Sequence, residues 1–206
     1  MSYELKEAQL SDVDEIGAIL DKVYAKDPLI SQLMPLAHAE KRAVFWAGWL
    51  RGDFSKPGEK LFKMAEVSSG TIVAFLKARY PAPKFVGPGG AAIPFPEGSN
   101  VELFNHCFAN MDTFEDKHMD YEKDYLVHVI GTLPEYHRNG LGSRLLTRFT
   151  DDADKAGAKT YLQATEIGAN LYPRLGWRDI EEMVTETPNG PIVWRCMMRE
   201  PCPLRN

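Results

Sequence analysis

The feature that most constrains the fold is a glycine-containing segment between an apolar run and a periodic helix. The apolar run covers residues 125–133, and the segment after it reads Pro-Glu-Tyr-His-Arg-Asn-Gly-Leu-Gly-Ser. Apolar residues then recur at helical spacing, at Leu141, Leu145 and Phe149. The pattern predicts a strand that ends, turns through two glycines and leads directly into a helix.

Such a turn suits an anionic ligand. The amide N–H groups in the first turn of a helix have no intrahelical partner, and the helix dipole favours negative charge at that end. Gly140 and Gly142 let a ligand approach the backbone closely. A diphosphate is the natural candidate. The alternative is a tight strand-to-helix turn that binds nothing.

Two common phosphate-binding patterns do not fit this segment. The Rossmann pattern needs three glycines in a different spacing and an acidic residue at the end of the next strand. The Walker A loop needs Gly-Lys-Ser/Thr, which the segment lacks.

The spacing His137-x-x-Gly140-x-Gly142 instead resembles motif A of the GNAT superfamily of N-acetyltransferases, Arg/Gln-x-x-Gly-x-Gly/Ala. In that family the motif follows a strand with an apolar-x-Pro ending, as Thr132-Leu133-Pro134 does here, and its amides bind the pyrophosphate of acetyl-CoA. The layout is closest to a fungal-type GNAT-like group. The resemblance assigns cofactor binding to His137, Arg138, Asn139, Gly140, Leu141, Gly142 and Ser143.

The sequence departs from motif A at one position. His137 stands where Arg or Gln is usual. Because backbone amides do most of the binding, this need not abolish it. The departure nevertheless keeps open a second function, a catalytically inactive acyl-CoA-binding sensor of the same fold.

Residues 169–177, Ala-Asn-Leu-Tyr-Pro-Arg-Leu-Gly-Trp, resemble motif B of the same family. There the tyrosine commonly protonates the departing CoA thiolate, which implies this role for Tyr172; a phenol with a pKa of about 10 suits it. The alternative is a core tyrosine bonded to a backbone group. Thr165, where Asn is frequent, is assigned to cofactor binding. Pro173 must lie in the first turn of a short helix expected over 167–175.

The strand before the loop is expected to diverge from the strand after it and to hold the pantetheine arm between them. The resemblance implies that Ile130, Gly131 and Thr132 supply these contacts and that a backbone amide polarises the thioester carbonyl. Gly131 either permits the close approach or marks a β-bulge.

An attacking alkylamine, with a pKa near 10.4, must first lose a proton. His128 is our candidate base, at an alternating position shared with Leu126 and Ile130, because its unperturbed pKa of about 6.5 suits the task. Asp124 and Glu166 are alternatives. A packed histidine without a catalytic role is the other interpretation.

The remaining pattern predicts an α/β (α+β) fold with a single domain over residues 1–206. Helices are expected near 13–23, 39–50, 100–121 and 141–156, and strands near 3–9, 61–67, 71–79, 125–133, 160–164, 177–186 and 191–199. The resemblance implies the GNAT fold, a mixed central sheet of about seven strands flanked by helices, with a splayed central pair.

A long insert, residues 81–121, precedes the motif strand and begins with an irregular loop over 81–100. Long loops of this kind are often functional, so we expect a lid over the acceptor. Five aromatic residues either line the acceptor side or belong to the core: Trp46, Trp49, Phe85, Phe95 and Phe108.

Composition and charge limit the classes of binding partner that we expect. The net charge of −5 argues against nucleic acid and mildly favours a basic amine. Three cysteines without metal or disulfide spacing, an N-terminus without a signal-peptide core and no long apolar segment predict a cytoplasmic protein without a membrane partner or metal. We expect acetyl transfer from acetyl-CoA to a primary amine of a small molecule or peptide, with a homodimer as a common state. O-acetylation and other acyl groups stay open.

Overall fold

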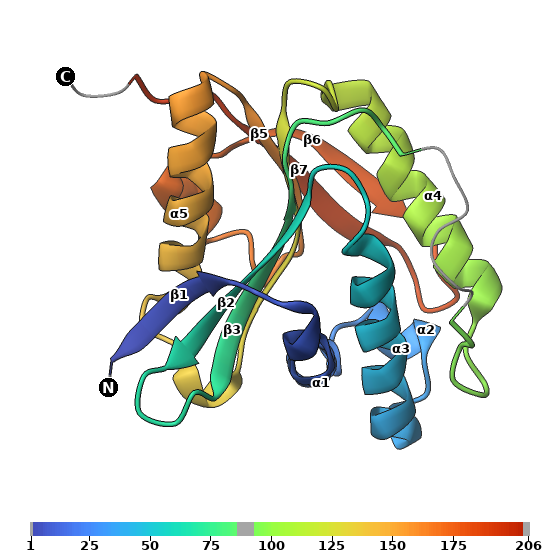
Figure 1. The fold of residues 1–206 in the computed structure, drawn as a ribbon. Helices are drawn as coiled ribbons and strands as arrows, with labels where there is room; N and C mark the ends of the chain where they lie inside the picture. The colour runs from blue at the N-terminus through green and yellow to red at the C-terminus, as the bar shows by residue number, and fades with distance from the viewer. Residues whose placement is uncertain (1, 86–92, 204–206) are drawn as a thin grey trace.

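A computed structural model describes residues 2–85 and 93–203, which build a seven-stranded sheet with helices on both faces (Figure 1). The strands are β1 Tyr3–Glu7, β2 Glu59–Glu66, β3 Ile72–Arg79, β4 Tyr125–Thr132, β5 Thr160–Ala164, β6 Arg178–Thr185 and β7 Ile192–Arg199. The α-helices are α1 Val13–Tyr24, α2 Ile30–Leu33, α3 Ala39–Asp53, α4 Val101–His118 and α5 Leu141–Ala156. The sheet order is β1-β2-β3-β4-β5-β7-β6.

The predicted mixed α/β fold is confirmed, with two local corrections, the first of which concerns a short helix. The helix expected over 167–175 is a single 3-10 turn, η4, at Tyr172–Leu175, and turns precede it. Pro173 lies in the first turn of η4, as its missing N–H requires, so a longer helix could not run through it. Residues 86–92 of the predicted lid lie outside the described residues.

The central strand pair separates early. β4 and β5 are parallel and pair at three positions, the last being Val127 opposite Leu162. From Val129 to Thr132, β4 is paired with β3 alone. The predicted splayed pair is therefore present, and it opens a gap in the middle of the sheet.

A β-bulge in β4 lies where this separation begins. Lys77 of β3 pairs with Val129 and Ala78 pairs with Val127, so His128 is the extra residue. The bulge breaks the expected alternation. Val129 packs with the core under α1 and α3, whereas Ile130 packs on the α5 side. The prediction that Ile130 shares a face with Leu126 is wrong, because an extra residue reverses the alternation.

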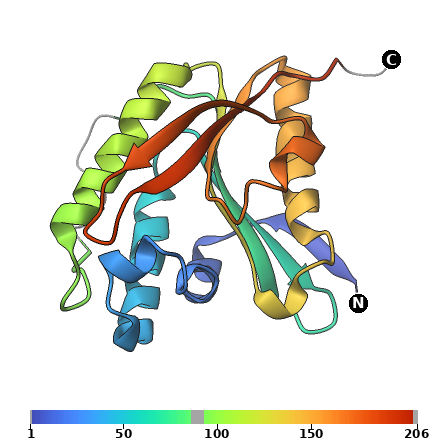
Figure 2. The ribbon, with the colours of Figure 1, turned by 180° about the vertical axis from the view of Figure 1, so that it is seen from behind.

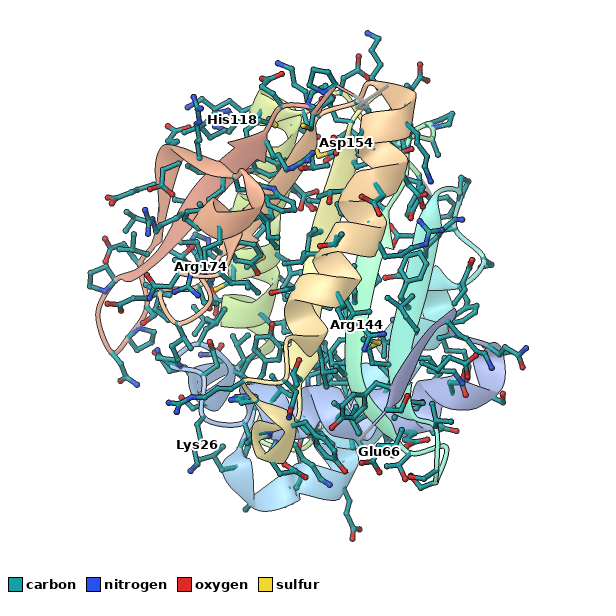
Figure 3. All side chains as sticks on the ribbon, turned by 90° about the vertical axis from the view of Figure 1, so that its left-hand side faces the viewer. Lys26, Glu66, His118, Arg144, Asp154 and Arg174 are labelled. Carbon is teal, nitrogen blue, oxygen red and sulfur yellow. The ribbon has the colours of Figure 1, made fainter. Side chains whose placement is uncertain are left out.

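Each face of the sheet has its own helices. The apolar side of α5 is buried against β2, β3 and β4, as its periodicity predicts. Figure 3 shows α5 lying across this face of the sheet, and buried apolar side chains of the helix and the strands pack together between them. Arg144 near the start of α5 donates to the Tyr3 carbonyl oxygen at 3.1 Å, and Asp154 near its end accepts from Arg199 at 2.7 Å. These contacts fix the helix, and with it the loop at its N-terminus.

The opposite face carries α1, α3 and α4, with α4 beside the β6–β7 hairpin (Figure 2). α1 and α3 approach so closely that a Cβ added to Gly17 would lie 2.7 Å from the Ala47 backbone nitrogen. A buried ion pair joins the same two helices. Arg42 donates from Nε to Asp21 at 2.6 Å and from Nη1 to the Pro35 carbonyl at 2.7 Å.

We predict that Asp21→Ala lowers the free energy of unfolding by about 3–5 kcal/mol, because it leaves the Arg42 charge buried without its partner. The two side chains are 3% and 7% exposed. Denaturant unfolding followed by circular dichroism measures the change. Glu4→Ala is the matched control: it removes a solvent-exposed pair with Lys6 and should cost less than about 1 kcal/mol. A similar small cost for Asp21→Ala would contradict the prediction.

Candidate active site

The predicted strand–loop–helix unit is present. After β4, one 3-10 turn at Pro134–Tyr136 leads into a loop in which Arg138 and Gly140 have left-handed backbones, with φ of 63° and 71°. Apart from Gly140 itself and its two chain neighbours, no atom of the described residues lies within 4 Å of a Cβ added to Gly140. The loop backbone at this glycine therefore faces open space immediately before α5 begins.

The start of α5 fits a pyrophosphate. The first-turn amides of Leu141, Gly142 and Ser143 have no intrahelical acceptor; the Arg144 N–H is the one that bonds back to the Gly140 carbonyl, at 3.0 Å. No acidic residue lies in this turn. Free N–H groups, the positive end of the helix dipole and the open position at Gly140 together form an anion cradle.

Two loop side chains support the loop. The His137 ring lies back against the end of β4, where its Nε2 donates to the Thr132 carbonyl at 2.9 Å. Asn139 donates to the Tyr136 carbonyl at 3.1 Å. The unusual residue of motif A thus stabilises the loop and leaves the backbone amides of the turn unobstructed.

The loop adjoins the gap between β4 and β5. A Cβ on Gly142 would lie 3.6 Å from Leu171 and 3.9 Å from Ile130, so the start of α5, the segment before η4 and β4 meet here. The Ile130 carbonyl accepts a hydrogen bond from the Tyr24 hydroxyl at 2.8 Å. With His137 on Thr132, two of the predicted pantetheine contacts already have partners within the chain.

Of the two interpretations considered for Gly131, a β-bulge is wrong, and the close approach of a ligand stays a prediction. The bulge lies three residues earlier, and Gly131 pairs regularly with Phe75. A Cβ here would lie 2.6 Å from the Phe75 ring. The glycine therefore makes room for this aromatic side chain in the core.

Tyr172 begins η4 and is buried, with its ring edge-to-face against Trp177 at 5.9 Å. Burial raises the pKa of Tyr172 to about 12. Among the described residues its hydroxyl has no hydrogen-bond partner. Burial and the nearby Tyr172 also raise the pKa of Tyr24. Two protonated phenols thus lie close to the gap.

A cavity of about 390 Å³ lies on the other face of the sheet, between α1, α3, α4 and the strands. Tyr24 and Thr165, which flank the gap, are part of its wall. Four of the five aromatic residues considered in the sequence also line it: Trp46, Trp49, Phe85 and Phe108. Phe95 packs in the core instead. The gap is thus bordered by the glycine loop on one side and by this cavity on the other.

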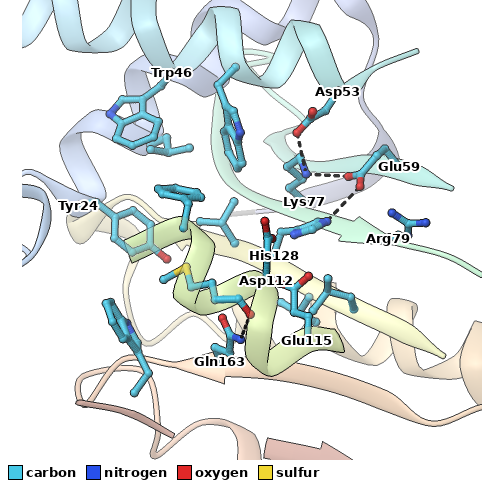
Figure 4. A pocket seen from close by; sticks show the side chains of 18 of the residues that line it. Tyr24, Trp46, Asp53, Glu59, Lys77, Arg79, Asp112, Glu115, His128 and Gln163 are labelled. Carbon is cyan, nitrogen blue, oxygen red and sulfur yellow. Dashed lines mark hydrogen bonds and ion pairs between the residues drawn. The ribbon is translucent and has the colours of Figure 1, made fainter. Parts of the chain in front are cut away.

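A chain of charged side chains forms one wall of the cavity (Figure 4). His128 Nε2 is 3.1 Å from Glu59 Oε1, and Lys77 Nζ is 2.7 Å from Glu59 Oε2 and 3.0 Å from Asp53 Oδ2. Lys56 also pairs with Asp53, at 2.5 Å. Sequence reasoning missed Glu59, Lys77 and Asp53. A lysine within the apolar run of β3 was the available signal, because such a residue needs a buried partner.

The facing wall belongs to α4 and is acidic. Burial raises the pKa of Glu115, and partial burial raises that of Asp112. Among the described residues neither carboxylate has an ion-pair partner; Glu115 accepts only the Tyr121 hydroxyl, at 3.2 Å. The cavity cation Arg79 is held by the carbonyls of Ala82 and Pro83.

The two alternative bases lie elsewhere. Asp124 accepts the Asp120 amide at 2.8 Å and does not line the cavity. Glu166 is exposed and lines a separate groove beside β6 and β7. Of the three candidates, only His128 faces the cavity.

Within residues 2–85 and 93–203, no group of three or more His, Cys, Asp or Glu side chains is arranged to hold a metal ion. None of the helices described is both long and apolar enough to cross a bilayer.

Known proteins share this fold. A structure described as histone acetyltransferase HPA2 and related acetyltransferase from Corynebacterium glutamicum has 19% identity and a TM-score of 0.67, with 98% of each chain covered. A Drosophila melanogaster polyamine N-acetyltransferase has 15% identity and a TM-score of 0.66, covering 97% of this chain and 100% of that one. The PaiA N-acetyltransferase from Thermoplasma acidophilum, solved with coenzyme A, has 14% identity and a TM-score of 0.55, covering 97% and 99%.

The family model described as Acetyltransferase (GNAT) family matches residues 34–177, which include the loop, the gap and η4. This chain therefore belongs to the GNAT acetyltransferase family.

Proposed function

We propose that this protein transfers the acetyl group of acetyl-CoA to a primary amine of a small molecule or peptide, by direct attack of the amine on the thioester. The observation that carries the proposal is the position of the β4–β5 gap. It lies between an anion cradle on the α5 side and an acid-rich cavity on the α3–α4 side. Family membership supports acyl transfer in general.

Acetyl-CoA would supply the activated acyl group. The amides of residues 138–143 would hold its pyrophosphate, and residues 130–132 would line the pantetheine arm. One GNAT structural neighbour was solved with coenzyme A, which supports this assignment. Tyr172 would keep its proton at neutral pH, because its pKa is raised to about 12, and would give it to the leaving thiolate.

The cavity favours a cationic amine as acceptor. Its lysines are already paired with carboxylates, whereas Asp112 and Glu115 have no ion-pair partner among the described residues. Aromatic walls suit an organic cation. A volume near 390 Å³ is typical of a small-molecule site, and one end of a peptide could also enter. A structural neighbour named for polyamine acetylation is in keeping with this class. His128 would accept the proton that the ammonium must lose.

A thiol-release assay with acetyl-CoA tests the activity. We expect CoA release that depends on an added amine, and faster release with small cationic diamines than with neutral alcohols. Acetyl-CoA binding without release with any amine or peptide would favour the inactive sensor. The absence of any thermal stabilisation by acetyl-CoA would contradict both functions.

Gly142→Glu should abolish acetyl-CoA binding, because a carboxylate at the start of α5 repels the pyrophosphate. At an acetyl-CoA concentration of 100 Kd the wild type should gain about 2.7 kcal/mol of stability, and the variant should gain none. Thermal unfolding with and without acetyl-CoA measures this. Gly142→Ala is the control: its Cβ would lie at an ordinary 3.6 Å from Leu171, so binding should persist. Equal stabilisation of the wild type and the Glu variant would place the pyrophosphate elsewhere.

Tyr172→Phe should lower kcat by about 10²–10⁴-fold while the Kd for acetyl-CoA stays the same, because only the proton donor is removed. Because a general acid works while protonated, no loss of activity from Tyr172 ionisation should occur below about pH 11. Tyr80→Phe, which removes a hydroxyl bonded to Asp152 outside the site, should leave kcat unchanged. An unaltered kcat for Tyr172→Phe would exclude the acid role.

A further inference from the structure

We propose that Glu59 is a positioning residue for His128. Its carboxylate fixes the proton of the imidazole on Nε2, so that Nδ1 is the ring nitrogen that receives the acceptor's proton, directly or through a water molecule. This inference rests on the proposed function for its catalytic meaning. The tautomer itself is a property of the protein alone.

The fold brings these two residues together over a long separation. Glu59 begins β2, His128 lies on β4, and β3 runs between them. His128 lies two residues after Leu126, on the face of the sheet that carries the cavity, and there it reaches Glu59 across β3. The bulge brings the next residue, Val129, to the same face, whereas regular pairing would turn it to the opposite one.

Glu59 is itself held firmly. Its side chain is 7% exposed, and its second oxygen accepts from Lys77 Nζ, which is anchored at Asp53 and lies 4.8 Å above the Trp49 ring. One carboxylate oxygen is therefore committed to Lys77 and the other to the imidazole (Figure 4).

The charge of Glu59 determines the direction of this hydrogen bond. Burial alone would raise its pKa, but His128 and Lys77 outweigh burial and hold the pKa of Glu59 below its ordinary range. An ionised carboxylate only accepts hydrogen bonds. His128 Nε2 must then carry the proton, and a neutral ring has its lone pair on Nδ1.

Other charged groups face the same ring. Glu115 and Asp112 of α4 lie across the cavity from Glu59, and Lys77 of β3 contacts the other oxygen of Glu59 (Figure 4). Because the base works unprotonated, kcat/KM should fall at acidic pH. Glu59→Gln removes one negative charge beside the ring, so this fall should begin at lower pH.

The experiment uses the whole protein labelled with ¹⁵N at histidine, with the His128 signals among the five histidines assigned by His128→Gln. Two-bond ¹H–¹⁵N correlation spectra identify the tautomer. We expect Nε2–H in the wild type and a switch toward Nδ1–H in Glu59→Gln, because the amide can donate to Nε2. Wild-type protein in the Nδ1–H form would overturn the proposal, whatever the variants do.

The kinetic arm measures kcat/KM against pH. Glu59→Gln should lower kcat/KM at least tenfold. A larger loss follows when the orienting aspartate of a serine-protease triad becomes asparagine, which is the same kind of change. Glu59→Asp, which keeps the charge, should retain part of the kcat/KM that Glu59→Gln loses. Glu66→Gln, at the other end of β2, is the control and should retain wild-type activity and tautomer.

A merely structural role for Glu59 predicts lost stability with the wild-type tautomer and pH profile retained, and that outcome also overturns the proposal. If acetyl transfer itself is absent while the Nε2–H tautomer is found and depends on Glu59, the proposed function fails and the positioning of the ring stands.

Discussion

The separation of β4 from β5 is the constraint on which the rest of the site depends. Parallel pairing ends at Val127, and the bulge at His128 follows in the next residue. Because a bulge bends and twists the strand that carries it, this local irregularity accounts for the end of the ladder and for the change of face at Val129 and Ile130. An unpaired edge inside a sheet leaves backbone polar groups without partners. Here the side chains of Tyr24 and His137 donate hydrogen bonds to two of these carbonyl groups, those of Ile130 and Thr132.

The sheet also separates two opposite electrostatic environments. On the α5 side, the open glycine loop and the start of the helix present backbone N–H groups without an acidic neighbour in the turn. On the α3–α4 side, the cavity holds lysines paired with carboxylates, and Asp112 and Glu115, which have no ion-pair partner within residues 2–85 and 93–203. Under the proposed function, the anionic acetyl-CoA and a cationic acceptor would reach the gap from different faces, each next to groups of opposite charge.

The sequence predicted the fold well because its strong signals are local. The glycine loop, the apolar side of α5 and the hairpin of β2 and β3 can each be identified within a dozen residues. The bulge at His128 was not predicted, because a period-two pattern assumes regular pairing and nothing in the composition of β4 identifies the extra residue. The cluster of Glu59, Lys77, His128 and Asp53 could not be predicted, because its members come from three strands and the end of α3 and meet only in the folded chain. Gly131 was considered for its own backbone, and the space that it leaves for the ring of Phe75 on the neighbouring strand could be identified only in the structure.

The position of α4 in the chain affects how the specificity for the proposed acceptor can evolve. It comes from one continuous insert between β3 and β4 and supplies Phe108, Met111, Asp112 and Glu115 to the cavity wall. The glycine loop and α5 come from a later stretch of chain. Exchanging this single insert would change the cavity wall that we propose to bind the acceptor and would leave the start of α5 intact. Under the proposed function, replacement of one segment would therefore be enough to change the choice of acceptor.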